Sequence, residues 1–143
     1  MANRKRVLFL CTGNSARSQM AEGLLRYRAG DRLDVFSAGT QPKGLHQRSV
    51  EVMKEIGIDI SRQVSKDAAR YANQPFDYVI TVCDRAKQNC PIFPGAESIH
   101  WGFDDPAEAP AERQLETFRR VRDEIRQRIN LFLTVVLPAK SIT

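Results

Sequence analysis

The sequence predicts a single α/β domain in which helices flank a four-stranded parallel sheet. Short apolar segments rich in β-branched residues alternate along the chain with longer segments whose apolar residues recur every three or four positions. Strands that alternate with helices in this way form parallel sheets. The chain has 143 residues, which suits one domain, so residues 1–143 are expected to form a single unit.

In the first half of the chain the pattern predicts, in order, a strand over residues 6–10, a helix over 18–28, a strand over 33–37 and a helix over 48–56. Gly30 and Gly57 are expected to end the two helices. The inner face of the first helix is expected to carry Met20, Leu24, Leu25 and Tyr27.

In the second half the pattern predicts a short helix over residues 65–72, strands over 76–82 and 98–101, and a long helix after Pro110. Ser65 is the expected N-cap of the short helix. The strand over 76–82 contains the strongly β-branched run Tyr-Val-Ile-Thr-Val. The long helix is expected to pack on the core through Leu115, Phe118, Val121, Ile125, Ile129 and Phe132.

The formal net charge of +5 comes from dispersed basic residues rather than from a tail or a patch. In the last helix, Arg119, Arg120, Arg122, Arg126 and Arg128 are mixed with acidic residues, a pattern typical of a solvated face. This dispersal disfavours nucleic acid as a partner and favours a mild field that attracts small anions. No apolar run is long enough for a signal sequence or a membrane span, so a soluble cytoplasmic protein is expected.

The segment from Cys11 to Ser18, Cys-Thr-Gly-Asn-Ser-Ala-Arg-Ser, places a thiol at the end of the first strand and an arginine six positions later. Backbone N–H groups of such a loop converge on one point, and a helix that begins near Ser18 directs its positive dipole end there. This environment stabilises the Cys11 thiolate, and the planar guanidinium of Arg17 can hold two oxygens of a tetrahedral oxyanion. The loop lacks the lysine and the second glycine of a nucleotide-binding loop.

Cys83 and Cys90 follow the third expected strand and are separated by six residues. This is not a zinc spacing, and His46 and His100 are the only histidines that could complete such a site, so no metal is expected. The three cysteines of the chain suit redox or nucleophilic use in a reducing compartment. A thiol relay from Cys11 to Cys83 to Cys90 is chemically reasonable, and two unrelated cysteines are the alternative.

Further residues fall near the same edge of the sheet. Cys11, Ser37 and Cys83 lie at or just beyond strand carboxyl ends, where ligands bind in open parallel sheets. Asp104-Asp105-Pro106 lies between the fourth strand and the last helix, and one of these carboxyls could protonate an oxygen that leaves the trapped anion. Taken alone, Asp-Pro is a common turn, so this role depends on the adjacent nucleophile.

Together these motifs resemble the thioredoxin-coupled arsenate reductases built on the low-molecular-weight protein tyrosine phosphatase fold. The resemblance rests on Cys11 to Gly23, Phe36-Ser-Ala-Gly-Thr, Thr81-Val-Cys-Asp, Cys90-Pro and Asp105-Pro, and spans almost the whole chain. The C-x5-R-S loop and Asp-Pro fit phosphatases equally well, whereas Cys83 and Cys90 favour the reductases. Ala16 departs from the many relatives that have a second cysteine in the loop, and Ala107 departs from the aromatic residues typical of the phosphatases.

The resemblance implies a role for each site residue. Cys11 is the nucleophile on arsenate, Asp105 is the general acid, and Ser18 hydrogen-bonds the thiolate. Asn14 shapes the loop with help from Ser37. The resemblance assigns oxyanion binding to Thr12, Gly13, Asn14, Ser15, Ala16, Arg17 and Ser18.

The resemblance also implies the order of the thiol steps. Cys83 attacks the Cys11 sulfur of the arsenic adduct and expels arsenite, and Cys90 then attacks Cys83. Thioredoxin regenerates the thiols, with glutaredoxin or a small thiol left open as the reductant. No metal or organic cofactor is expected, an alkali cation near Asn14 and Ser37 is left open, and a monomer is the default.

Two alternative functions remain at this point. The first is a low-molecular-weight phosphatase that carries incidental cysteines. The second is a non-catalytic module that binds anions or senses redox state. The sequence favours the reductase because hydrolysis of a phosphoester has no use for the thiols of Cys83 and Cys90.

Overall fold

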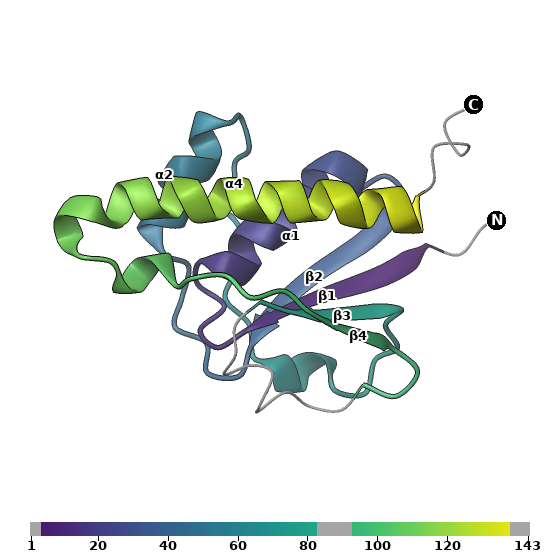
Figure 1. Ribbon diagram of the computed structural model, residues 1–143. Coiled ribbons are helices and arrows are strands. Elements are labelled where there is room, and N and C mark those ends of the chain that lie inside the picture. Colours follow the sequence, from purple (N-terminus) through teal and green to yellow (C-terminus); the bar gives the residue numbers. More distant parts are fainter. Residues whose placement is uncertain (1–3, 83–92, 138–143) are drawn as a thin grey trace.

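The computed structural model describes residues 4–82 and 93–137, which contain one four-stranded sheet (Figure 1). The strands are β1 (Lys5–Cys11), β2 (Leu33–Gly39), β3 (Tyr78–Thr81) and β4 (Glu97–His100). They lie in the order β2-β1-β3-β4, and each neighbouring pair is parallel. The predicted four-stranded parallel sheet is therefore confirmed, although β3 is shorter than the strand expected over 76–82.

β1 lies in the interior of the sheet, with β2 on one side and β3 on the other. Its last five residues are buried, as expected for a parallel strand that is covered on both faces. Pairing with β2 extends to the end of the strand, where Cys11 lies opposite Gly39. The backbone of the expected nucleophile is therefore held firmly at the carboxyl edge of the sheet.

Three α-helices, α1 (Arg17–Ala29), α2 (Gln47–Glu55) and α4 (Ala111–Val136), pack against one another. Figure 1 shows α1 and α4 over one face of the sheet, with the 3-10 helix η1 (Ala68–Tyr71) on the other side. The short 3-10 helix η2 (Pro106–Glu108) precedes α4. The predicted core stripe of α4 is buried from Phe118 to Phe132, with Leu115 half-buried at its start. Within the described residues, no helix is long and apolar enough to cross a membrane.

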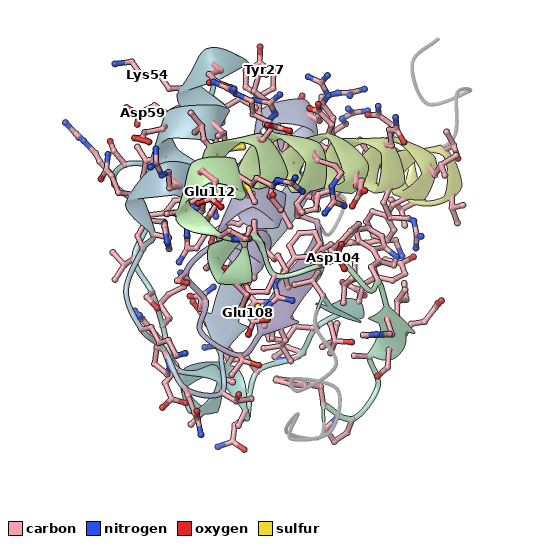
Figure 2. All side chains as sticks on the ribbon, turned by 60° about the vertical axis from the view of Figure 1, so that its left-hand side comes forward. Tyr27, Lys54, Asp59, Asp104, Glu108 and Glu112 are labelled. Atoms are coloured by element: carbon pink, nitrogen blue, oxygen red, sulfur yellow. The ribbon has the colours of Figure 1, made fainter. Side chains whose placement is uncertain are left out.

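Tyr27 does not lie on the inner face of α1, contrary to the prediction. Its side chain is 66% exposed and projects from the surface in Figure 2. Gly23 lies one turn earlier in α1, and the side chains of Ile60 and Met53 cover it closely. A Cβ added at Gly23 would lie 2.5 Å from Ile60 and 3.3 Å from Met53. Tyr27 lies beyond this cover, so its position on the apolar stripe does not bury it.

The prediction of Ser65 as an N-cap is also wrong. The short helix is the 3-10 helix η1, and its N-cap is Asp67, whose carboxylate accepts the N–H of Ala69. The hydroxyl of Ser65 instead donates to the carbonyl of Gly13, at 3.1 Å. The residue therefore supports the loop that follows β1 rather than a helix end.

Arg122 departs from the solvated face predicted for the arginines of α4. It is buried, and its guanidinium donates to the Val52 carbonyl and to the Glu55 carboxylate, both at 2.8 Å. A second arginine, Arg119, pairs with the same carboxylate at 2.7 Å. These bonds lower the pKa of Glu55, with the hydrogen bond from Arg119 as the largest cause. Part of the basic face of α4 therefore joins α4 to α2.

Candidate active site

The loop between β1 and α1 has its carbonyl groups turned outward. The backbone N–H groups of residues 40–46 donate to these carbonyls: Thr40 to Cys11 (3.2 Å), Gln41 to Thr12 (2.8 Å), Lys43 to Gly13 (2.9 Å) and His46 to Ser15 (2.9 Å). In a planar trans peptide the following N–H points the opposite way, so these bonds turn N–H groups of the loop inward. The first turn of α1 also has no side-chain cap. The loop is therefore a concave array of N–H donors that suits an anion.

The side chain of Asn14 joins this loop to neighbouring parts of the chain by hydrogen bonds. It is fully buried and has a positive φ of 45°, a conformation that asparagine adopts more readily than most residues. Its side-chain N–H2 donates to the hydroxyls of Ser18 (2.8 Å) and Ser37 (2.9 Å). Its side-chain oxygen accepts from Gln19 (3.1 Å) and from the backbone of Lys66 (2.8 Å). The expected contact between Asn14 and Ser37 is present, and it joins the loop to β2.

A buried carboxylate continues this network. The hydroxyl of Ser37 donates to Glu22 at 2.5 Å, and Glu22 pairs with Arg26 at 2.6 Å and with Lys66 at 3.6 Å. Burial lowers the pKa of Lys66, and the charge of Glu22 partly opposes this shift. No sequence pattern indicated that Lys66 belongs to this network, whereas a glutamate among the buried residues of α1 was a usable signal.

The alkali cation that was left open near Asn14 and Ser37 does not fit this arrangement. Two N–H donors already use the side-chain oxygen of Asn14. Two basic side chains and one hydroxyl already surround the carboxylate of Glu22. A further cation would add a third positive charge beside one carboxylate, which is electrostatically unfavourable in a buried site.

Arg17 lies between the anion loop and the segment that follows β4. Its guanidinium donates to the Phe103 carbonyl at 3.1 Å and lies 3.5 Å from the Asp105 carboxylate. Its Nε is buried and has no hydrogen-bond partner in the described part of the chain. A buried N–H without a partner is costly, so this atom is a candidate for binding an oxygen of a substrate anion.

Both Asp104 and Asp105 line the site, but only Asp105 pairs with Arg17. The second oxygen of Asp105 accepts the N–H of Ala107 at 3.0 Å, as the N-cap of η2. Asp104 is exposed and pairs with Arg120 of α4 at 3.0 Å. Of the two acids that the sequence left open, Asp105 is therefore the one in contact with Arg17.

These residues surround a cavity of about 730 Å³. Cys11, Thr12, Gly13, Ser15, Ala16 and Arg17 form one part of its wall, and residues 43–47, 102–105, 107 and 108 form the rest. Cys11 is only 3% exposed, so the thiol of the expected nucleophile lies at the floor. The expected nucleophile, arginine and acid thus line one cavity, whereas Asn14 and Ser18 are buried behind it.

His46 also lines this cavity and was not predicted to take part in the site. It is the N-cap of α2, and its Nδ1 accepts the N–H of Arg48 at 3.1 Å, which places the proton of the neutral ring on Nε2. Burial lowers the pKa of His46, and the charge of Asp105 partly opposes this shift. The ring lies 4.8 Å from that of Phe118 in α4. Histidine is not one of the residues that commonly cap helices, so the sequence carried no signal for this role.

Cys83 and Cys90 lie outside the described residues. The last residue described before them, Val82, donates its N–H to the carbonyl of Leu10 at 2.9 Å. Leu10 directly precedes Cys11, so Val82 lies beside the carboxyl end of β1. The other histidine considered for a metal, His100, contacts the Thr81 hydroxyl through Nδ1 at 2.7 Å.

Comparison with known proteins agrees with this geometry. Residues 6–141 match the model of the low molecular weight phosphotyrosine protein phosphatase family. The chain is 50% identical over 133 residues to an arsenate reductase of Halalkalibacterium halodurans, an alignment that covers 91% of this chain and 96% of that relative.

The solved structures that are similar to the chain include two arsenate reductases. The structure of an arsenate reductase in its oxidized state has a TM-score of 0.79 and 30% identity, covering 92% of this chain and 98% of that one. A thioredoxin-dependent arsenate reductase of Corynebacterium glutamicum has a TM-score of 0.63 and 31% identity, covering 91% of this chain and 64% of that one.

Proposed function

The chain belongs to the low molecular weight phosphotyrosine protein phosphatase family, and we propose that within this family it is an arsenate reductase. The observation that carries the proposal is the 50% identity over 133 residues to an arsenate reductase, because the anion loop by itself would also fit a phosphatase. Inward N–H groups and the buried Nε of Arg17, which has no partner among the described residues, surround a cavity that has Cys11 at its floor. A tetrahedral oxyanion matches this set of donors, and relatives with up to 50% identity carry the name arsenate reductase.

In the first step the thiolate of Cys11 attacks arsenic(V) and forms a sulfur–arsenic bond, while one oxygen of arsenate leaves as water. Arg17 and the loop N–H groups hold the remaining oxygens. Asp105 supplies a proton to the departing oxygen, which requires that its carboxyl exchanges the contact with Arg17 for one with the substrate. The Asn14 amide donates to the Ser18 oxygen, which leaves the Ser18 proton available for the thiolate.

In the second step the thiolate of Cys83 attacks the sulfur of Cys11. A disulfide forms between these two residues, the sulfur–arsenic bond breaks, and its electron pair stays on arsenic, which leaves as arsenite. Cys90 then attacks Cys83, so that Cys11 is released as a thiolate and a disulfide joins Cys83 to Cys90. Two thiols thus supply the two electrons, and no metal or organic cofactor is needed.

Thioredoxin is the proposed reductant of the final disulfide. A relative described as thioredoxin-dependent supports this choice. A third protein thiol also favours thioredoxin, because a small thiol could resolve the adduct of Cys11 by itself. We further propose a monomer that acts in the cytoplasm, where thioredoxin is kept reduced.

The test combines arsenate with thioredoxin, thioredoxin reductase and NADPH. The wild type should oxidise NADPH continuously, whereas Cys90→Ser should stop after one turnover with a disulfide between Cys11 and Cys83, which mass spectrometry of the peptides identifies. Cys83→Ser is the matched variant and should accumulate no disulfide at Cys11. Rapid hydrolysis of an aryl phosphate without NADPH oxidation would instead support the phosphatase alternative, and no turnover in either assay would support a binding module.

A further inference from the structure

The cavity over the anion loop is not uniformly positive. Its lining carries only two cationic side chains, Arg17 and Lys43, within the described part of the chain. The lining also carries three carboxylates, which belong to Asp104, Asp105 and Glu108. An anion that approaches Cys11 therefore passes acidic groups, and the cations on the other wall must offset them.

The charged groups of this lining differ in whether they have partners. Arg17 faces Asp105 at 3.5 Å, and Asp104 pairs with Arg120 at 3.0 Å. The ammonium of Lys43 makes no ion pair or hydrogen bond within residues 4–82 and 93–137. Its positive charge is therefore the one cationic charge of this lining that no described carboxylate neutralises.

The backbone fixes Lys43 directly at the loop. Its N–H donates to the Gly13 carbonyl at 2.9 Å. Its side chain runs across Gly13, since a Cβ added at that glycine would lie 3.4 Å from Cδ and 3.5 Å from Cγ of Lys43. Both distances are ordinary van der Waals contacts, so the aliphatic part of Lys43 packs directly beside Gly13. The lysine stem thus lies against the loop that receives the anion.

We propose that Lys43 recruits the substrate: its ammonium raises the affinity of the loop for tetrahedral oxyanions that carry two negative charges. The inference rests on the proposed function, to which it adds a specificity-determining residue. An ammonium acts as a compact point charge on a flexible stem, so it attracts the dianion without fixing its geometry. Lys43 therefore affects capture of the oxyanion, expressed in Kd and in kcat/KM, and leaves kcat unchanged.

The experiment measures binding of inorganic sulfate and phosphate to the full chain by calorimetry, at low salt and at 0.5 M NaCl. Sulfate is a dianion throughout the neutral range, so it reports charge without the complication of titration. In Lys43→Met we expect Kd for sulfate to rise by about 3- to 10-fold at low salt, from loss of one nearby charge on a dianion. At high salt the difference should shrink to less than about 2-fold because exposed charges are screened.

Two variants serve as controls. Lys43→Arg keeps the charge and should bind sulfate nearly as well as the wild type. Lys54→Met makes the same change in net charge at an exposed position of α2, which Figure 2 shows well away from Asp104 and Glu108, and should leave Kd unchanged. Wild-type affinity of Lys43→Met at low salt, equal weakening at both salt concentrations, or a loss in Lys43→Arg as large as in Lys43→Met would each overturn the inference.

The same measurements separate this inference from the proposed function. Sulfate and phosphate bind without any redox step, so dependence of their Kd on Lys43 supports the inference even if arsenate is not reduced. Conversely, arsenate reduction by Lys43→Met with wild-type kcat/KM at low salt would overturn the inference and leave the reductase function intact.

Discussion

Gly39 ends β2 against the anion loop, where the structure leaves no room for a side chain. A Cβ at this position would lie 2.6 Å from the Thr12 carbonyl oxygen and 2.8 Å from the Asn14 nitrogen, and both atoms belong to the backbone. To reach an ordinary contact of 3.4 Å, the loop must move by about 0.8 Å, the difference between 3.4 and 2.6 Å. We expect Gly39→Ala to lower the free energy of unfolding by about 1–3 kcal/mol. Displacement of the loop should lower kcat/KM for arsenate by about 10- to 100-fold.

The assay compares NADPH oxidation in the thioredoxin-coupled system with urea unfolding of the same variants. Gly30→Ala is the matched control. A Cβ at Gly30 would be equally crowded, at 2.4 Å from the Arg26 carbonyl oxygen, but Gly30 lies at the opposite end of α1 from the loop. It should lose stability and keep the wild-type Kd for phosphate. If Gly39→Ala reduces arsenate within about twofold of the wild-type rate, the loop does not need the position seen here.

Three further predictions concern the residues around the loop. Asn14→Ala removes the buried amide that joins the loop to β2, and we expect a loss of about 2–4 kcal/mol in urea unfolding; wild-type stability would contradict this role. Burial lowers the pKa of His46 below 6.5. The unfolded chain therefore takes up a proton on His46 at a higher pH than the folded chain does, so the free energy of unfolding decreases as the pH falls from 6.5 toward the pKa of the folded state. His46→Asn keeps a side chain that can cap α2 but does not titrate. Between pH 7.5, 6 and 5, the free energy of unfolding should therefore decrease less in this variant than in the wild type, and equal decreases would refute the role of His46. Exchange of Na⁺ for K⁺ at constant ionic strength should leave kcat/KM unchanged, because two basic side chains already pair with Glu22; activation by K⁺ would show that a cation binds after all.

Local patterns in the sequence were sufficient to predict the parallel sheet and the loop between β1 and α1. The apolar run before Cys11 forms the interior strand β1, and α1 begins at Arg17, one residue before the predicted start at Ser18. The stripe from Phe118 to Phe132 is also buried as its spacing predicts. Each of these features depends on residues that are close together in the chain, where periodicity and loop chemistry are informative.

Features that depend on packing between distant segments could not be predicted in this way. Arg122 belongs to a charged helical pattern, yet the carbonyl of Val52, 70 positions away, gives its guanidinium a buried partner. Tyr27 lies on the apolar stripe of α1, yet the cover provided by Ile60 ends one turn before it. Lys43 carries no sequence signal, because its importance arises from a backbone bond to Gly13 that only the folded chain shows.

Because the carbonyl groups of the anion loop point outward, the exchange rates of its inward N–H groups should report whether an anion is bound. Its inward N–H groups should exchange quickly with deuterium when the cavity contains only water, whereas those of the buried strand β1 should exchange slowly. An oxyanion that accepts these N–H groups would slow their exchange selectively. Amide protection in residues 12–17 would thus reveal occupancy of the site for any anion, including one that never undergoes chemistry.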